Sequence, residues 1–176
     1  IHYCSVIKDK QESIEILKAQ LEKVEKEKNK GKTLEEAENI SAKEIEVKPV
    51  MSLVSKIIAI QDIKKGQAVG YGSNFIAKDD MRIGIVACGY GDGYPRHAKT
   101  GTPIFVHDKT TKTVGRVSMD MLYVDLSKIE KAVIGSKVEM WGNHISVDEV
   151  AKNSGTVGYE LLCNISASSR VPLDYI

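Results

Sequence analysis

Glycine is distributed very unevenly along this chain of 176 residues. Residues 51–176 contain 13 of the 14 glycines, whereas residues 1–50 contain one glycine and 21 of the 49 charged side chains. Glycine is unfavourable inside helices and permits tight turns, so this distribution separates two kinds of structure. We expect a charged helical segment over residues 1–48 and a turn-rich domain over residues 49–176, with Pro49 at the boundary.

An apolar stripe runs along the first region. Ile7 and Ile14 begin a seven-residue repeat, which predicts one face of a long helix over residues 8–29, and Thr33 is placed to begin a second helix. Two interpretations stay open, a coiled-coil dimerisation arm and an ordinary helix on the surface of a domain. The repeat lasts barely three heptads, which favours the surface helix.

The second region is rich in short apolar segments that predict strands. The expected strands are 50–60, 82–90, 102–108, 114–126 and 136–142. Short strands at this spacing are typical of a small barrel or a sandwich. We therefore expect a mainly β (α+β) domain, shaped like a small β-barrel and preceded by the charged helical segment.

The fourth of these segments alternates along its whole length and is expected to be one strand over residues 114–126. On such a strand Arg116 and Asp120 lie four residues apart and project from one face. Spacing alone favours a cross-strand ion pair for these two residues, with Met119 pointing into the core on the other face.

Two short helices are expected near the end of the chain. Ser146 is placed to cap the first helix, with Glu149 completing a capping box and Gly155 ending it. The segment 156–166 predicts the second helix, with Thr156 as its cap.

Composition excludes several classes of protein. The net charge of +1 gives no reason to expect a nucleic acid or a membrane surface as partner. The three scattered cysteines have neither disulfide nor metal spacing, which favours a cytoplasmic location. No apolar run reaches the roughly 18–20 residues of a membrane span, and no signal peptide is visible. Because the chain begins at Ile1 and not at a methionine, we expect a fragment of a longer protein.

Two Gly-Tyr-Gly triplets stand out, "GYGSNF" at 70–75 and "GYGDGYPR" at 89–96. The second fits neither a Walker nor a Rossmann loop, and its spacing alone favours a hairpin loop with aromatic residues packed at its edges. Tyr71, in the first, is expected in a loop between two strands. A phenol with an ordinary pKa near 10 is a poor base at neutral pH, so catalysis by Tyr71 requires nearby positive charge, and nothing local supplies it. The local sequence therefore favours a packed aromatic side chain, unless another chain brings the charge.

The four histidines form no metal-binding or triad pattern, and we expect no metal site. His144, in "WGNHIS", is expected to be a turn residue.

Taken in order, the motifs resemble the C-terminal domain of alanine racemase over residues 49–172. The motifs that carry this resemblance are "VMSLVSKI", "VGYGSNF", "GYGDGYPR", "VGRVSMDMLYVDL", "MWGNHISVDEVAKNSGT" and "GYELLCNIS…RVP". Each motif alone is weak, but their succession is highly specific.

The resemblance implies an isomerase that uses pyridoxal 5'-phosphate to interconvert L- and D-alanine, the latter being a component of the bacterial cell wall. It implies a head-to-tail dimer in which each site combines the N-terminal α/β barrel of one chain with the C-terminal domain of the other. A barrel lysine that carries the cofactor is one base, and a tyrosine matching Tyr71 is the other. The cofactor delocalises the charge of the carbanion, so the protein's task is to position the two bases.

The resemblance also implies roles for six other residues. The Met119 backbone N–H helps to hold the substrate carboxylate, and Tyr90 lines the path by which the substrate arrives. Arg96, Arg116 and Asp120 lie at the entrance of that path. Tyr159 contacts the cofactor phosphate and closes the inner gate.

The sequence departs from the family pattern in two places. No segment resembles the cofactor-lysine motif, and the eight-stranded barrel, which needs about 200 residues, is largely absent. Residues 1–50 hold at most one or two of its strand–helix units, so a barrel remnant is a further interpretation of residues 1–48, beside the coiled-coil arm. The segment "CNISASSRVP" carries two extra residues before Arg170. We therefore expect the 176-residue chain to be inactive alone and to supply Tyr71 in trans to a barrel on another chain, as a homodimer or a split-protein complex. The alternatives are an inactive stand-alone domain used for binding or dimerisation, and a likeness of fold only.

Overall fold

The computed structural model of the chain describes residues 5–8, 22, 49, 51–167 and 173–175. The helices expected over 8–29 and after Thr33 lie outside these residues, apart from Lys8 and Glu22. Lys8 is the last residue of a strand, β1 (Ser5–Lys8), so the expected helix does not begin there. Glu22 is helical and exposed.

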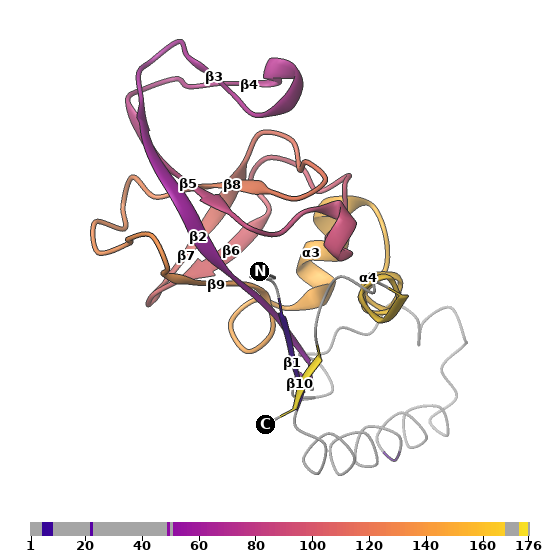
Figure 1. Ribbon diagram of the computed structural model, residues 1–176. Coiled ribbons are helices and arrows are strands. Elements are labelled where there is room, and N and C mark those ends of the chain that lie inside the picture. The colour runs from indigo at the N-terminus through magenta and orange to yellow at the C-terminus, as the bar shows by residue number, and fades with distance from the viewer. Residues whose placement is uncertain (1–4, 9–21, 23–48, 50, 168–172, 176) are drawn as a thin grey trace.

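Six antiparallel strands form a closed barrel, which confirms the barrel-like, mainly β fold expected from the sequence (Figure 1). Around the barrel, each strand pairs with the next and the last returns to the first. In this order the strands are β2 (Ser52–Ile63), β5 (Met81–Val86), β8 (Leu122–Asp125), β7 (Lys109–Val114), β6 (Pro103–Val106) and β9 (Lys137–Trp141). Closure leaves the barrel without a free sheet edge.

Strand β2 closes the barrel because its two halves pair with different neighbours. Residues 53–56 pair with β9, whereas residues 57–63 pair with β5. The register with β5 shifts between Ile57 and Ala59, and such a bulge bends a strand and increases its twist. The start of β2 also pairs with β1, which in turn lies parallel to β10 (Leu173–Tyr175).

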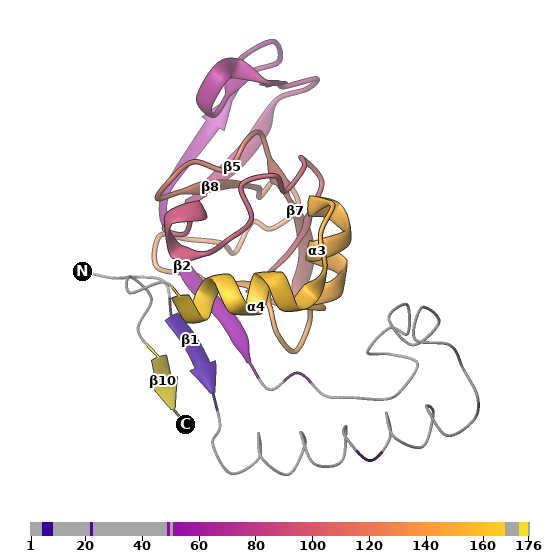
Figure 2. The ribbon, with the colours of Figure 1, turned by 90° about the vertical axis from the view of Figure 1, so that its right-hand side faces the viewer.

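Two helices cover one side of the barrel (Figure 2). They are α3 (Val147–Ser154) and α4 (Gly158–Ala167). As expected, the Ser146 side chain caps α3, accepting the Asp148 N–H, and Gly155 ends the helix with a φ of 72°. The second helix is confirmed too, but it begins two residues after its expected cap, Thr156.

The core joins the barrel to these helices. Side chains from all of these elements are almost completely buried, including Leu53, Ile57, Val86, Ile104, Leu122, Val124, Trp141, Val150, Leu161 and Ile165. Tyr94 stacks on Trp141 with ring centroids 5.8 Å apart, and burial raises the pKa of its hydroxyl. The apolar side chains of the predicted strands therefore do form the core of the domain.

The segment 114–126 is not one strand, so that prediction is wrong. Strand β7 ends at Val114, β8 begins at Leu122, and a loop joins them. Gly115 begins the loop with a φ of 73°, and within it the Ser118 N–H donates to the Met121 carbonyl at 2.9 Å. A left-handed glycine followed by a closed turn interrupts the strand despite its alternating sequence. Arg116 and Asp120 therefore do not share a strand face.

The hairpin interpretation of "GYGDGYPR" is also wrong. The loop leads from β5 to β6, but β8 and β7 lie between these two strands in the barrel. It therefore crosses the end of the barrel and does not connect two paired neighbours. A hairpin requires its flanking strands to pair, and that pairing is set by closure of the whole sheet.

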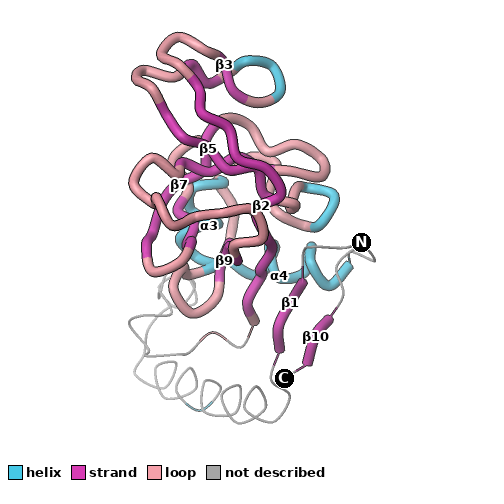
Figure 3. Tube along the Cα trace, turned by 60° about the vertical axis from the view of Figure 1, so that its left-hand side comes forward, coloured by secondary structure: helices cyan, strands magenta, loops and turns pink. Residues whose placement is uncertain are grey.

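A small hairpin projects from the far ends of β2 and β5 (Figure 3). Strands β3 (Ala68–Val69) and β4 (Phe75–Ile76) pair with each other and form a separate two-stranded sheet. We call residues 64–80 the arm. A core of three buried side chains, Val69, Ile83 and Val114, lies beneath it.

Candidate functional site

Tyr71 lies at the tip of the arm, in the turn between β3 and β4. This confirms the expected loop between two strands, and the loop forms one 3₁₀ turn, Tyr71–Ser73. Gly70, Gly72 and Ser73 have φ values of 76°, 77° and 51°. Tyr71 itself is 75% exposed, and no hydrogen bond reaches its hydroxyl from the described residues. The turn therefore presents a free phenol to the outside.

The glycine before Tyr71 lies close to the rest of the site. A Cβ at Gly70 would lie 3.4 Å from the Tyr123 ring and 3.7 Å from the Arg116 backbone nitrogen. The turn thus packs against the start of the loop 115–121, and a side chain at Gly70 would be strained by its positive φ as well.

The loop of the second triplet packs on the far end of the same loop. The N–H of Tyr90 donates to the Ser118 carbonyl at 3.0 Å, and the N–H of Gly91 donates to the Met119 carbonyl at 2.9 Å. A Cβ at Gly89 would collide with the Met119 carbonyl, so glycine permits this close approach. The buried Asp92 carboxylate accepts the Gly89 N–H at 2.9 Å and closes the turn.

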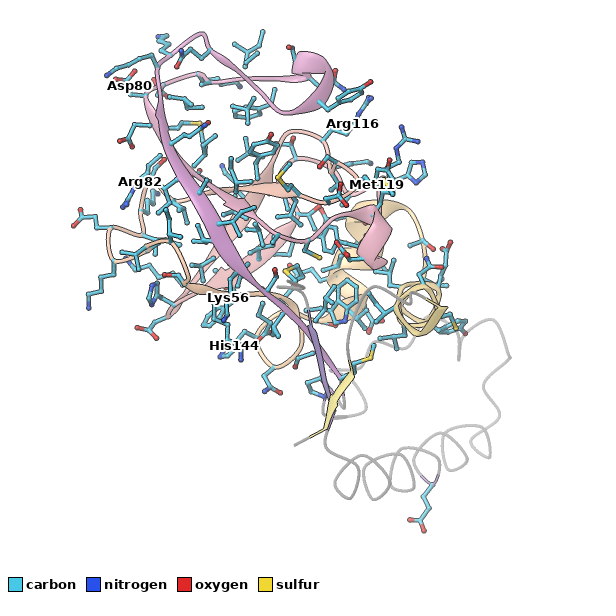
Figure 4. All side chains as sticks on the ribbon, viewed as in Figure 1. Lys56, Asp80, Arg82, Arg116, Met119 and His144 are labelled. Carbon is cyan, nitrogen blue, oxygen red and sulfur yellow. The ribbon has the colours of Figure 1, made fainter. Side chains whose placement is uncertain are left out.

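Met119 presents its backbone to the outside. Its carbonyl is engaged by Gly91, while within the described part of the chain no hydrogen bond takes up its N–H. Its side chain is 51% exposed and does not point into the core, which corrects the interpretation drawn from strand spacing. Figure 4 shows Met119 and Arg116 on the side of the molecule to which the tip of the arm projects.

Tyr90 and Arg96 form a pair. The Arg96 guanidinium carbon lies 5.5 Å from the centre of the Tyr90 ring, within the range of a cation–π contact. Both line a pocket of about 600 Å³ between their loop and the α3–α4 connection. The arginine therefore holds the ring that the resemblance places beside the substrate path.

Arg96 and Arg116 line a second pocket, of about 700 Å³, which we call the arginine pocket. Its wall also includes Asn74, His97 and Lys99, and no acidic side chain is among its lining residues. A pocket lined by cations and free of carboxylates favours anions. Two of the three predicted entrance residues are thus brought together.

Asp120 and Tyr159 are the remaining predicted residues. Asp120 is exposed in the loop 115–121, next to Met119. Tyr159 is 68% exposed on the first turn of α4, and its neighbour Glu160 lines the pocket of Tyr90 and Arg96. The structure therefore brings Tyr71, Tyr90, Arg96, Arg116 and Met119 together through three touching loops, with Asp120 beside them. Tyr159 is not among the residues that line either pocket.

Sequence reasoning missed Asn74 and Lys99, which both line the arginine pocket. Asn74 stands inside the motif "VGYGSNF", and its side-chain amide next to a glycine-rich turn was the available signal. Nothing in the sequence around Lys99 relates it to Arg116.

The described residues contain no group of three or more His, Cys, Asp and Glu side chains placed to hold a metal ion. Among the helices that the structure describes, none is long and apolar enough to cross a membrane.

His144 lies in a bend after β9, as expected of a turn residue. Its ring stacks on Phe105 with centroids 3.7 Å apart, and Nδ1 lies 2.8 Å from the Glu139 carboxylate. Glu139 also accepts the backbone N–H groups of His144 and Ile145, so this cluster fixes the connection between β9 and α3.

Comparisons with known proteins agree with this geometry. The family described as "Alanine racemase, C-terminal domain" matches residues 50–175. An alanine racemase of Burkholderia mallei is 56% identical over 127 residues, which are 72% of this chain and 35% of that protein. The chain therefore spans about a third of the length of the curated relatives it matches.

Solved structures give the same result. The biosynthetic alanine racemase of Pseudomonas aeruginosa superposes with a TM-score of 0.75 at 49% identity, covering 78% of this chain and 38% of that one. The alanine racemase of Bartonella henselae, described with covalently bound pyridoxal phosphate, gives a TM-score of 0.67 at 26% identity, covering 72% of this chain and 35% of that one. The chain belongs to the alanine racemase family, of which it carries the C-terminal domain.

Proposed function

We propose that this chain supplies Tyr71 as the proton-transferring group of an alanine racemase whose barrel belongs to another chain. In this proposal the substrate is alanine, and the domain acts in the cytoplasm, in the supply of D-alanine for the cell wall. The family membership and the arrangement of the three loops support it.

The observation that carries the proposal is the exposed phenol of Tyr71. A tyrosine is an amphipathic side chain that normally buries most of its ring, yet this one is 75% exposed on a turn with three positive φ values. Tyr90 and Met119 on the neighbouring loops are exposed as well, and so is Tyr159 on α4. Such a surface fits a partner chain that covers it.

Proton transfer to and from Cα requires a group within hydrogen-bond reach of the substrate. The Tyr71 hydroxyl projects from a tip that a partner's cleft can enclose. A phenol acts as a base at neutral pH when positive charge lies nearby, and in this proposal the partner barrel supplies that charge and the second base.

The other residues of the site bind and orient the substrate in this proposal. The Met119 N–H is free to donate to a carboxylate oxygen, and the arginine pocket draws the carboxylate toward the site. The Tyr90 ring, held by Arg96, forms a wall of the path, and Asp120 stands at its entrance. Tyr159 lies on the wall formed by α4 and closes the path.

Pyridoxal phosphate, when bound, delocalises the negative charge that develops at Cα. The residues of this chain fit one part of such a cofactor, because the exposed Tyr159 hydroxyl is a suitable donor to a phosphate oxygen. We assign the lysine that carries the cofactor to the partner barrel.

A mixing experiment tests the proposal. The barrel half of the Pseudomonas aeruginosa racemase is expressed separately and mixed with the 176-residue chain in the presence of pyridoxal phosphate, and alanine racemisation is followed by polarimetry. We expect no activity from either half alone and restored activity in the mixture.

Two results contradict the proposal. Racemisation by the 176-residue chain alone places the complete site within it. Failure to associate with the barrel half, together with self-association of this chain, supports the stand-alone binding domain instead.

A further inference from the structure

The Asn74 side chain links two of the loops that form the site. Its amide satisfies both of its neighbours in one orientation only, in which Nδ2 donates to the Gly72 carbonyl at 2.9 Å and Oδ1 accepts from Arg116 Nη2 at 2.7 Å. The first bond holds the turn that carries Tyr71, and the second ties that turn to the loop 115–121. A hydrogen bond to a charged guanidinium is among the stronger kinds.

The turn needs such support because its own hydrogen bonding is sparse. The described backbone bond inside it runs from the Ser73 N–H to the Gly70 carbonyl, at 3.3 Å. Ser73 has a φ of 51° without being glycine, which costs conformational energy. The Tyr71 ring lies mostly in solvent, so the backbone of the turn sets the direction of the phenol.

Arg116 is a suitable anchor because the residue before it is fixed to the barrel. The Gly115 N–H donates to Thr100 Oγ1 at 3.0 Å, and the same hydroxyl donates to the Gly115 carbonyl at 3.3 Å. A Cβ at Gly115 would lie 3.1 Å from the Val69 carbonyl, so the two loops are in close contact. The backbone that carries the Arg116 side chain is therefore held in place.

We propose that Asn74 is a positioning residue, which fixes the direction of the Tyr71 phenol by binding the turn to Arg116. Its effect on catalysis rests on the proposed function, but its effect on the order of the turn does not. Arg116 has a double role in this account, since it lines the arginine pocket and orients the proton-transferring group.

The Asn74 side chain is uncharged, and this matters for the charge of the arginine pocket. Its oxygen accepts a hydrogen bond from Arg116 without cancelling the positive charge, whereas an aspartate in its place would form an ion pair. Arg96 and Lys99 also lie on the wall of the arginine pocket, so an aspartate at position 74 would reduce the positive charge of that pocket.

The first test uses the chain as it is. Backbone ¹⁵N relaxation is measured for Tyr71–Asn74 in the parent chain and in Asn74→Ala, Arg116→Ala and the double variant. We expect order parameters near about 0.85 in the parent to fall below about 0.6 in each single variant, with no further loss in the double variant. Lys99→Ala is the matched control, because it removes a cation from the same pocket without touching the turn.

The melting temperature distinguishes a local from a global effect. Asn74 and Arg116 are both exposed, so we expect the melting temperature of each variant to stay within about 2 °C of the parent value. Unchanged order parameters at residues 71–74 in Asn74→Ala overturn the proposal. If Asn74→Ala does not fold, Arg116→Ala gives the same test, since it removes the same hydrogen bond from the other side.

A second test concerns the proton transfer itself, in the mixture with the barrel half. Asn74→Ala is expected to lower kcat about 10-fold or more with little change in KM, because a misdirected acid or base loses part of its catalytic effect. The primary deuterium isotope effect is expected to rise only for the enantiomer whose α-hydrogen faces Tyr71.

The two tests can fail independently of each other. If Asn74→Ala disorders the turn but leaves the isotope effect unchanged, the structural role of Asn74 stands and its role in catalysis is contradicted. If the parent mixture is inactive and Asn74→Ala still disorders the turn, the proposed function is contradicted and the structural role of Asn74 stands.

Discussion

The arm and the barrel of this domain are stabilised in different ways. A continuous core joins five of the six barrel strands to the two helices, whereas the cluster at the base of the arm has three buried side chains, Val69 of the arm with Ile83 and Val114 of the barrel strands. The arm nevertheless carries Tyr71, on a turn with three positive φ values. Proteins often place reactive groups on local, strained turns that a rigid scaffold supports, and here the scaffold is the barrel.

This comparison predicts different consequences for the same change in the two regions. Val124→Ala removes two methyl groups from the fully buried core of the barrel and is expected to cost about 2–4 kcal/mol of unfolding free energy. Val69→Ala makes the same change beneath the arm, where the surroundings relax more easily, and is expected to cost about 1–2 kcal/mol. Urea denaturation measures both.

Hydrogen exchange shows which part of the domain each substitution destabilises. Val69→Ala is expected to raise exchange at residues 64–80 and leave the barrel amides protected, because the arm opens locally. Equal losses of protection throughout the domain would show that the arm and barrel unfold as one unit, and the comparison would then fail.

Gly89→Ala tests the contact between the loops at the end of the barrel. The added methyl group meets the Met119 carbonyl, so one loop must move, and we expect a loss of about 1–3 kcal/mol. The Met119 amide resonance is expected to shift in an HSQC spectrum while the arm amides remain in place.

Tyr94→Phe is expected to be neutral or to stabilise the barrel by about 1 kcal/mol. The buried Tyr94 hydroxyl has no hydrogen-bond partner, and removing an unpaired buried hydroxyl removes its desolvation cost. Thermal unfolding checks this result. A clear loss of stability would indicate a buried water that bridges this hydroxyl to a neighbour, such as the similarly unpaired Trp141 Nε1.

Asp80→Asn at the base of the arm is expected to have the smallest effect. Asp80 pairs with Lys64 at 2.7 Å, and the hydrogen bond from that lysine holds the pKa of the carboxyl below its ordinary value of 3.8. A lowered pKa gives a stabilisation that is complete above about pH 4 and is lost as the pH falls through the folded-state value. Both side chains are exposed, so parent and variant are expected to differ little at pH 7 and to converge near pH 2. A difference that grows on acidification contradicts this account.

Local patterns predicted much of this fold because local physics determines it. Short apolar segments predicted β2, β5, β6 and β9, and the Ser146 cap and Gly155 predicted α3. Strand β7 was missed because its sequence, KTTKTV, is mostly polar and exposed at the start. The break after Val114 was missed because Val117, Met119, Met121 and Tyr123 alternate through the loop and into β8.

The site was predicted through the family resemblance and not through chemistry that the sequence displays. From the local sequence alone, Tyr71 was predicted to be a packed aromatic and Met119 to be a core residue. Neither the exposure of Tyr71 at the tip of the arm nor the free Met119 N–H can be predicted from the residues around it. The bond between Asn74 and Arg116 depends on a contact between distant loops. Closure of the barrel creates that contact, so no local sequence pattern predicts it.

The central claim is that Tyr71 transfers a proton in a site completed by another chain, and one comparison of rates tests it directly. Tyr71→Phe and Tyr94→Phe each lose one phenolic hydroxyl, and each is mixed with the same barrel half under saturating conditions. We expect Tyr71→Phe to lower kcat for alanine racemisation by about 10²–10⁴-fold and Tyr94→Phe to leave it unchanged. A Tyr71→Phe mixture that racemises alanine as fast as the parent mixture would contradict the account.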